Sequence, residues 1–428
     1  MNTFGRILTK TLLMSVVATS AAFAENIAIV GARVHTMSNQ GSIDNATVLI
    51  RDGKIQRVLN ETPALAGYRV IDGKGKVVTP GLMGAYTSLG LVEVGFSAGT
   101  VDARTIASGI STTGAALDVS YGVNPHSSLI PISRSEGVTS AATALQNTDQ
   151  LFQGQGAIIT LHGNTPVLRS AAFIATGVDN GSADDIGESR AALWVTLEKA
   201  LVEAKYIDGK SITPQSEWHG ASTVEDAIAL SAVVKGEVPL MIEVHRESDI
   251  RQVIAFKQRH EGINVVLLRA TEGWKAAKEL AAANIPVILN PESNLPYEFD
   301  QLAATLENAG RLHDAGVLVA IGMNTHNIRL AKQHAGNAVS HGLDWEAGLA
   351  ALTINPARIY AVDDMLGSIE AGKRADIVVW SGDPLEVTET AEIVLIGGEQ
   401  VDMTSRQSKL RDRYLQKAQG KTVHYVRP

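Results

Sequence analysis

Polar side chains recur at or just beyond the ends of apolar, strand-like runs, and their types are those that bind ligands or move protons. They are Tyr86, Ser88, Thr160, His245, Arg269, Asn324 and His326. A neutral imidazole binds a divalent ion or exchanges a proton near neutral pH. A guanidinium binds a carboxylate through two parallel hydrogen bonds. These residue types together indicate a polar ligand site.

Three of these side chains have both a functional and a simpler interpretation. Arg269 either clamps a substrate carboxylate or pairs internally with Glu243 or Glu272. His245 either holds a metal or a ligand, or is a hydrogen-bonded histidine with neither role. Tyr86 either acts as a phenolic acid, base or anion contact, or fills space in the interior. The residue types alone leave these alternatives open.

The elements that must position these residues follow Val77, where apolar runs begin to alternate with segments of helical period. The strand-like runs are Leu82–Thr87, Val138–Ala144, Ala157–Leu161, Leu240–His245, Val265–Ala270, Pro286–Asn290 and Val317–Ile321. The helical segments between the later runs are 248–260, 273–283, 300–313 and 327–339. Apolar strands separated by amphipathic helices predict a parallel sheet covered on both faces. The number of units favours a closed α/β barrel of the (β/α)8 TIM type, with the polar stretches 91–125 and 163–215 as loops at its mouth.

Both ends of the mature chain have strand-and-turn character instead. Short apolar or alternating runs separated by turn formers occupy residues 25–79, and similar runs return at 367–380 and 393–398. The simplest packing joins the two ends in one small β-sandwich into which the barrel is inserted. The expected organisation is a signal peptide over 1–24, a composite β-sandwich from 25–79 plus 364–403, a barrel over 80–363, and a charged helical tail over 404–428.

The first 24 residues have the pattern of a secretory leader. Arg6 and Lys10 precede an uncharged apolar stretch, and Ala22-Phe23-Ala24 supplies the small-x-small cleavage pattern. The apolar part is too short to span a bilayer, which needs about 20 apolar residues. Cleavage after Ala24 and a periplasmic location are therefore expected, with secretion as the second choice.

Composition excludes several classes of function. The chain of 428 residues has no cysteine, which excludes disulfides, thiolate metal sites and catalytic thiols. Its net charge of −8, without a basic stripe, argues against nucleic acid as a partner. No stretch beyond the leader is long and apolar enough for a membrane span, and no membrane partner is expected.

Four motifs, in this order and at these spacings, resemble the amidohydrolase superfamily, in particular the group that contains imidazolonepropionase and its periplasmic relatives. They are Ile71-Asp-Gly-Lys-Gly-Lys-Val-Val-Thr-Pro-Gly81, Ala351-Leu-Thr-Ile-Asn-Pro-Ala-Arg358, Gly367-Ser-Ile-Glu-Ala-Gly-Lys-Arg-Ala-Asp-Ile-Val-Val379 and Gly382-Asp-Pro384. The resemblance covers nearly the whole mature chain. It implies a barrel mouth where one or two divalent ions activate water and polarise a carbonyl.

The resemblance also implies where the ligands stand, and most of those positions hold other residues here. Tyr86 and Ser88 replace two histidines of the first strand, Thr160 stands for the fourth-strand carboxylate or lysine, Arg269 for a sixth-strand histidine, and Asn324 for the proton-carrying aspartate. The fifth-strand histidine, His245, is the only retained metal-ligand position. Two unit positive charges ~4 Å apart repel by roughly 4 kcal/mol at an effective dielectric of 20, and a divalent ion beside Arg269 doubles that. His326, two residues beyond Asn324, is a candidate replacement for the lost acid/base group.

These observations lead to two hypotheses of function. The first is an amidohydrolase-like pseudoenzyme that binds a small ligand with an amide or carboxylate, or that accompanies an active amidohydrolase paralogue or a second copy of itself. The alternative is an active hydrolase of non-peptide or dipeptide-like C–N bonds that works with one metal ion or none. The first hypothesis expects no cofactor, and the second expects zinc or another divalent metal.

Overall fold

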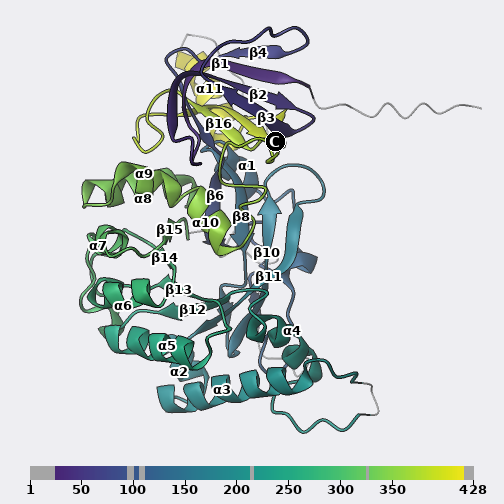
Figure 1. The fold of residues 1–428 in the computed structure, drawn as a ribbon, viewed down its shortest axis with the longest axis vertical. Coiled ribbons are helices and arrows are strands. Elements are labelled where there is room, and N and C mark those ends of the chain that lie inside the picture. Colours follow the sequence, from purple (N-terminus) through teal and green to yellow (C-terminus); the bar gives the residue numbers. More distant parts are fainter. Residues whose placement is uncertain (1–24, 94–100, 106–110, 213–215, 324–326, 419–428) are drawn as a thin grey trace, which may run out of the picture.

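The computed structural model describes residues 25–93, 101–105, 111–212, 216–323 and 327–418. They form two large sheets, one built from both ends of the chain and one that curves into a barrel surrounded by helices (Figure 1). The expected leader, residues 1–24, lies outside the described residues. No helix within the described ranges is long and apolar enough to cross a bilayer.

The barrel sheet contains eight strands in the order β15-β14-β13-β12-β11-β10-β8-β6. Their bounds are β6 (Leu82–Thr87), β8 (Val138–Thr143), β10 (Phe152–Thr160), β11 (Val167–Gly177), β12 (Leu240–Val244), β13 (Val265–Arg269), β14 (Val287–Leu289) and β15 (Val319–Ile321). The backbone N–H of Tyr86 donates to the carbonyl of Gly322 over 3.1 Å and links the two edge strands β6 and β15. The molecule therefore has the mixed α/β fold with a nearly closed, TIM-like barrel that the sequence predicted.

Strand β10 departs from the wholly parallel sheet that the sequence predicted. It runs antiparallel to both of its neighbours, β8 and β11, whereas the other neighbouring strands of the barrel pair in parallel. The connections 144–151 and 161–166 are too short for a crossover helix, so each one reverses the chain direction. In chain order, β11 is consequently the fourth strand of the barrel and the third with the common direction. This strand lies in the stretch 163–215 that had been assigned to loops, and that assignment was wrong.

Helices cover the outside of the barrel. They are α1 (Leu129–Arg134), α2 (Asn180–Asp185), α3 (Arg190–Ile207), α4 (Val224–Val234), α5 (Glu247–Arg259), α6 (Ala277–Ala282), α7 (Asn308–Asp314), α8 (Ala331–Ser340), α9 (Trp345–Ala350) and α10 (Ile354–Ile359). Helix α5 shows why these segments are helical. Ile250, Val253 and Ile254 recur at helical spacing and are buried. Acidic residues in the first turn and basic residues in the last turn interact favourably with the helix dipole.

The second sheet joins the two ends of the chain. Its strands are β1 (Ile27–His35), β2 (Ser42–Arg51), β3 (Lys54–Leu59), β4 (Arg69–Asp72), β5 (Val77–Pro80), β16 (Ile377–Trp380), β17 (Ala391–Ile396) and β18 (Glu399–Gln400). Strand β16 pairs antiparallel with β5, which leads directly into the first barrel strand. The eight strands form one connected sheet, so the composite unit is present but a two-layered sandwich is not confirmed.

The last described element is α11 (Arg406–Ala418), which follows the composite sheet. A separate apolar cluster fills the inside of the barrel, where residues from successive strands meet. Tyr86 and Phe173 pack there with ring centroids 6.0 Å apart, and Phe173 packs on Tyr360 at 5.0 Å. This packed interior forms the floor beneath the ends of the parallel strands.

Candidate functional site

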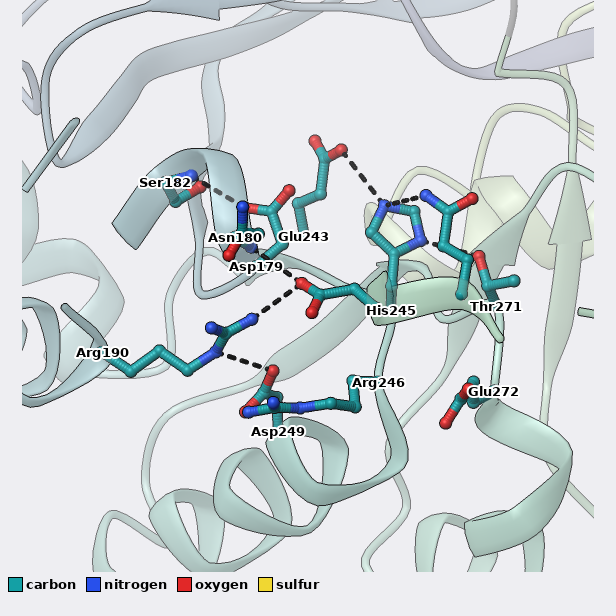
Figure 2. A network of polar contacts seen from close by, with 12 residues as sticks. Asp179, Asn180, Ser182, Arg190, Glu243, His245, Arg246, Asp249, Thr271 and Glu272 are labelled. Carbon is teal, nitrogen blue, oxygen red and sulfur yellow. Dashed lines mark hydrogen bonds and ion pairs between the residues drawn. The ribbon is translucent and has the colours of Figure 1, made fainter. Parts of the chain in front are cut away.

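His245 follows β12 at the end of the barrel where the parallel strands finish. The side chain is buried, and its Nδ1 lies 2.7 Å from the hydroxyl of Thr271. Its Nε2 lies 3.5 Å from Nε2 of Gln301 and 4.0 Å from Oε1 of Glu243 (Figure 2). Burial lowers the pKa of His245, and the charge of Arg269 lowers it further. A neutral imidazole whose Nδ1–H donates a hydrogen bond to the Thr271 hydroxyl presents the Nε2 lone pair to this end of the barrel.

Glu243 and Arg269 form an ion pair on the neighbouring strands β12 and β13. The Arg269 Nε donates to Oε1 of Glu243 over 2.5 Å, and the side chains are 41% and 19% exposed for Arg269 and Glu243 respectively. Burial raises the pKa of Glu243, although the nearby Arg269 opposes that shift. Of the two internal partners considered for Arg269, the structure selects Glu243. Glu272 instead accepts hydrogen bonds from the backbone N–H groups of Glu247 and Ala303.

An unusual backbone conformation at the end of β13 brings Arg269 to this partner. Arg269 and Ala270 have φ values of 68° and 40°, in the left-handed region that non-glycine residues rarely occupy. Val266 and Leu268 belong to the cluster inside the barrel, so strict strand alternation would direct Arg269 outward. The left-handed turn breaks that alternation, and such strained positions concentrate at functional sites.

Asp179 completes a group of three potential ligands. It follows β11 and caps the N-terminus of α2, where its Oδ1 accepts from the backbone N–H of Ser182 over 3.1 Å. One ligand atom each from Asp179, Glu243 and His245 lie within 4.8 Å of one another. An imidazole and two carboxylates suit a single zinc-like ion, which commonly has three protein ligands and a water in catalytic sites.

The superfamily resemblance implies one or two divalent ions, and the donors present can be compared with that requirement. The set of Asp179, Glu243 and His245 fits one ion in ligand type and number, but Arg269 already occupies one oxygen of Glu243. The described residues place no second such group of histidine and acidic ligands around this end of the barrel. Within the described residues, the donors therefore suit one ion rather than two, and Arg269 competes with that ion for the Glu243 carboxylate.

Tyr86 and Ser88 lie on and just after β6 and are both buried. The Tyr86 hydroxyl donates to Oε1 of Gln153 over 2.8 Å. Burial raises the pKa of Tyr86 far above its ordinary value, and the negative charge of Glu243 raises it further. The phenol is therefore a neutral hydrogen-bonding group packed on Phe173, which favours the space-filling interpretation over proton transfer.

Thr160 lies away from these residues, and its expected place at the mouth is corrected. It pairs with Ser140 near the start of β8, and its hydroxyl accepts from Nη2 of Arg374 over 2.8 Å. Because β10 is antiparallel, its last residues lie at the end of the barrel that faces the composite sheet. Asn324 and His326 lie outside the described residues.

Three site residues were missed by sequence reasoning because no motif marks them. Asp179 lies two residues beyond β11, in a stretch for which the sequence predicts loops. Asp300 and Gln301 belong to the segment after β14, where Asp300 accepts from the backbone N–H of Asn180 over 2.9 Å and from Nη2 of Arg190 over 2.7 Å. This anchor holds the neighbouring Gln301 beside His245. The acidic residue at the end of β11 was the available signal, and it required the correct strand assignment.

Comparisons with known proteins agree with the fold. Residues 264–410 match the model of the Amidohydrolase family. Amidohydrolase tasK of Hapsidospora irregularis is 23% identical over 404 residues, which cover 82% of this chain but only 39% of that protein. An imidazolonepropionase of Brevibacillus brevis is 24% identical over 408 residues, covering 82% of this chain and 87% of that protein.

The crystal structure of an amidohydrolase from Thermotoga maritima MSB8 superposes with a TM-score of 0.78 and 25% identity, covering 88% of this chain and 99% of that chain. The family match and this structural likeness support the assignment to the amidohydrolase superfamily. The chain is thus similar in fold to amidohydrolases.

Proposed function

We propose that this protein uses an amidohydrolase scaffold to bind a small molecule that carries a carboxylate or an amide, without the two-ion hydrolysis typical of the superfamily. The ion pair between Arg269 and Glu243 carries this proposal, because a permanent cation stands beside the one cluster of ligand atoms among the described residues. A second cation at this spot faces charge repulsion from Arg269 and competition for the Glu243 carboxylate.

The side chains of this site can recognise both ends of such a ligand. Arg269 is 41% exposed and contacts Glu243 through Nε, so its terminal nitrogens can bind a carboxylate in a bidentate manner. The amide of Gln301 and the neutral imidazole of His245 offer a donor and an acceptor beside it. The ligand carboxylate would also pair with the positive charge of Arg269, which Glu243 neutralises in the free protein.

Calorimetric titration of the mature, metal-free protein with N-acetyl amino acids and dipeptides tests this proposal. Binding is expected for the wild type and should weaken about tenfold or more in Arg269→Gln, because a charge-assisted bidentate contact contributes roughly 1.5–3 kcal/mol. Thr160→Val is the matched control and should bind as the wild type does, since Thr160 lies at the other end of the barrel. Equal binding by Arg269→Gln and the wild type would contradict the proposal.

A second candidate function is hydrolysis of a C–N bond with a single ion, and the group of Asp179, Glu243 and His245 favours it. An ion held by these residues would supply an activated water and polarise the scissile carbonyl. Elemental analysis of the purified wild type, combined with assays on dipeptides and cyclic amides with added zinc or manganese, distinguishes the two functions. One bound ion that is lost in His245→Ala, together with turnover that depends on it, would establish the hydrolase and reject the binding protein.

The leader pattern supports a further part of the proposal, namely export to the periplasm with cleavage after Ala24. Intact-mass measurement of the protein from a periplasmic extract checks it, and a mature chain beginning at Glu25 is the expected result. We also propose that the partners are a second copy of this chain or an active amidohydrolase paralogue. The native mass of the purified complex and the intact masses of its subunits distinguish the two.

A further inference from the structure

The negative charge of Glu243 lies beside apolar residues and is paired with one permanent cation, Arg269. Met241, two residues earlier on β12, lies in the cluster inside the barrel, and the side chain of Glu243 is only 19% exposed. Among the described residues, its salt-bridge partners are Arg269 at 2.5 Å and His245 at 4.0 Å. The lowered pKa of His245 favours the neutral imidazole. Removing Arg269 would therefore leave a largely buried carboxylate without its counter-ion, which is strongly unfavourable.

The surroundings of Glu243 already contain what a divalent cation requires. Asp179 offers a second carboxylate, and His245 is oriented by Thr271 in the manner in which metal-bound histidines are commonly oriented by a hydrogen bond on the other ring nitrogen. The three ligand atoms come from the ends of the adjacent strands β11 and β12 (Figure 2). Arg269 already binds the Glu243 carboxylate of this group, where a cation would compete with it.

We propose that Arg269 is a built-in counter-ion that takes the place of a divalent cation, and that Asp179, Glu243 and His245 form a latent single-cation site beneath it. The left-handed backbone at Arg269 and Ala270, which directs the guanidinium to Glu243, is the structural device that keeps the site closed. The inference shares with the proposed function only the position of Arg269. It concerns the cation that the three ligand residues would accept in its absence.

The test measures zinc and manganese binding by calorimetry and by thermal shift on tag-free protein without any substrate. Arg269→Ala and Arg269→Gly are compared with the wild type, and Gly is included because it adopts a φ of 68° without strain. Both variants should bind one ion about 100-fold more tightly than the wild type, since each one loses a competing cation and frees a carboxylate oxygen. The melting temperature of both should rise on adding zinc.

Two controls make the result specific. Arg251→Ala removes an arginine of similar exposure, 43%, from the surface pairs with Glu247 and Glu279, and it should bind zinc no better than the wild type. Adding His245→Ala to Arg269→Gly should abolish the gain. Unchanged affinity in both Arg269 variants, or a gain that survives the loss of His245, would overturn the proposal. Failure of the wild type to bind carboxylates would instead reject the proposed function and leave this inference standing.

Discussion

At the scale of single residues, the ion pair of Arg269 and Glu243 has one member far more exposed than the other. Arg269 reaches solvent, whereas Glu243 extends from β12 into the packed barrel. Burial raises the pKa of Glu243, so ionisation is less favourable in the folded protein than in the unfolded chain. Ionised Glu243 therefore lowers the free energy of unfolding, and groups with shifted pKa values are concentrated at functional sites.

Glu243→Gln is expected to become more stable relative to the wild type as the pH rises. The folded-state pKa of Glu243 is raised above its ordinary value of 4.5, so the wild type loses stability as the pH rises from that value through the folded pKa. The glutamine variant does not titrate there. Chemical denaturation of both proteins between pH 4.5 and 8 measures the difference, and a difference that shrinks with rising pH would contradict the expectation.

The lowered pKa of His245 also makes folding stability depend on pH, but here stability is lost as the pH falls. Its folded-state pKa lies below the ordinary 6.5, so stability is lost as the pH falls from that value towards the folded pKa. Both proteins of the comparison contain His245, and its contribution is largely removed by taking the difference between them.

The backbone at Arg269 leads to a second prediction at this scale. Arg269→Gly should be more stable than Arg269→Ala by about 0.5–1 kcal/mol, because alanine is strained at positive φ and glycine is not. Both variants lose the same guanidinium, so the comparison isolates the conformation of residue 269. Equal free energies of unfolding from urea titrations would show that the strain is relieved elsewhere.

At the scale of elements, the segment after β14 is held in place by the buried carboxylates of Asp300 and Glu272, and Glu272 accepts from the backbone N–H of Ala303. Asp300 bonds to Arg190 at the start of α3 and to the backbone N–H of Asn180 at the start of α2, and this connects three elements around His245. The same segment exposes the apolar residues Leu295, Tyr297 and Phe299. Its position beside the site thus depends on polar anchoring rather than on burial of its own side chains.

Asp300→Ala is expected to release this segment. The loss of a buried ion pair costs about 3 kcal/mol, and limited proteolysis should then cut within 291–299 faster than in the wild type. Glu298→Ala changes an exposed acid of the same segment and serves as the control that should leave cleavage unchanged. Similar cleavage rates in the two variants would mean that Asp300 is not the anchor.

At the scale of the whole molecule, the barrel depends on a sheet to which both ends of the chain contribute. Strand β16 lies beside β5 with Val379 opposite Val78, and the Trp380 ring nitrogen donates to the hydroxyl of Thr79 over 2.9 Å. Trp380 is fully buried. The helix α11, by contrast, exposes Leu410, Tyr414 and Leu415.

Two truncations should therefore behave differently. A chain that ends at Ser405 loses α11 and should keep its free energy of unfolding within about 1 kcal/mol, since changes at exposed positions are usually small. A chain that ends at Asp363 loses β16 and β17 and should not fold, because several buried side chains worth about 1.5–3 kcal/mol each exceed the total stability of a typical domain. Circular dichroism and thermal melting of the two proteins provide the measurement.

The sequence by itself determined the elements whose signals are local. Apolar runs and helical periods located β6, β12 and β13 to within one residue at either end, because the core-facing pattern of a strand is written in its own residues. The order of the motifs also indicated the superfamily before any contact was known. His245 was found this way, since a histidine that follows a strand directly is visible in the sequence.

Only the tertiary structure decided which side chains share the site. Strand β10 pairs antiparallel with both neighbours, which places Thr160 at the far end of the barrel. The next strand, β11, then ends near His245 and places Asp179 beside it. The choice of Glu243 as partner of Arg269 depends on two left-handed residues that break the alternation of β13. Such contacts join residues far apart in the chain, and no local pattern of residue types can specify them.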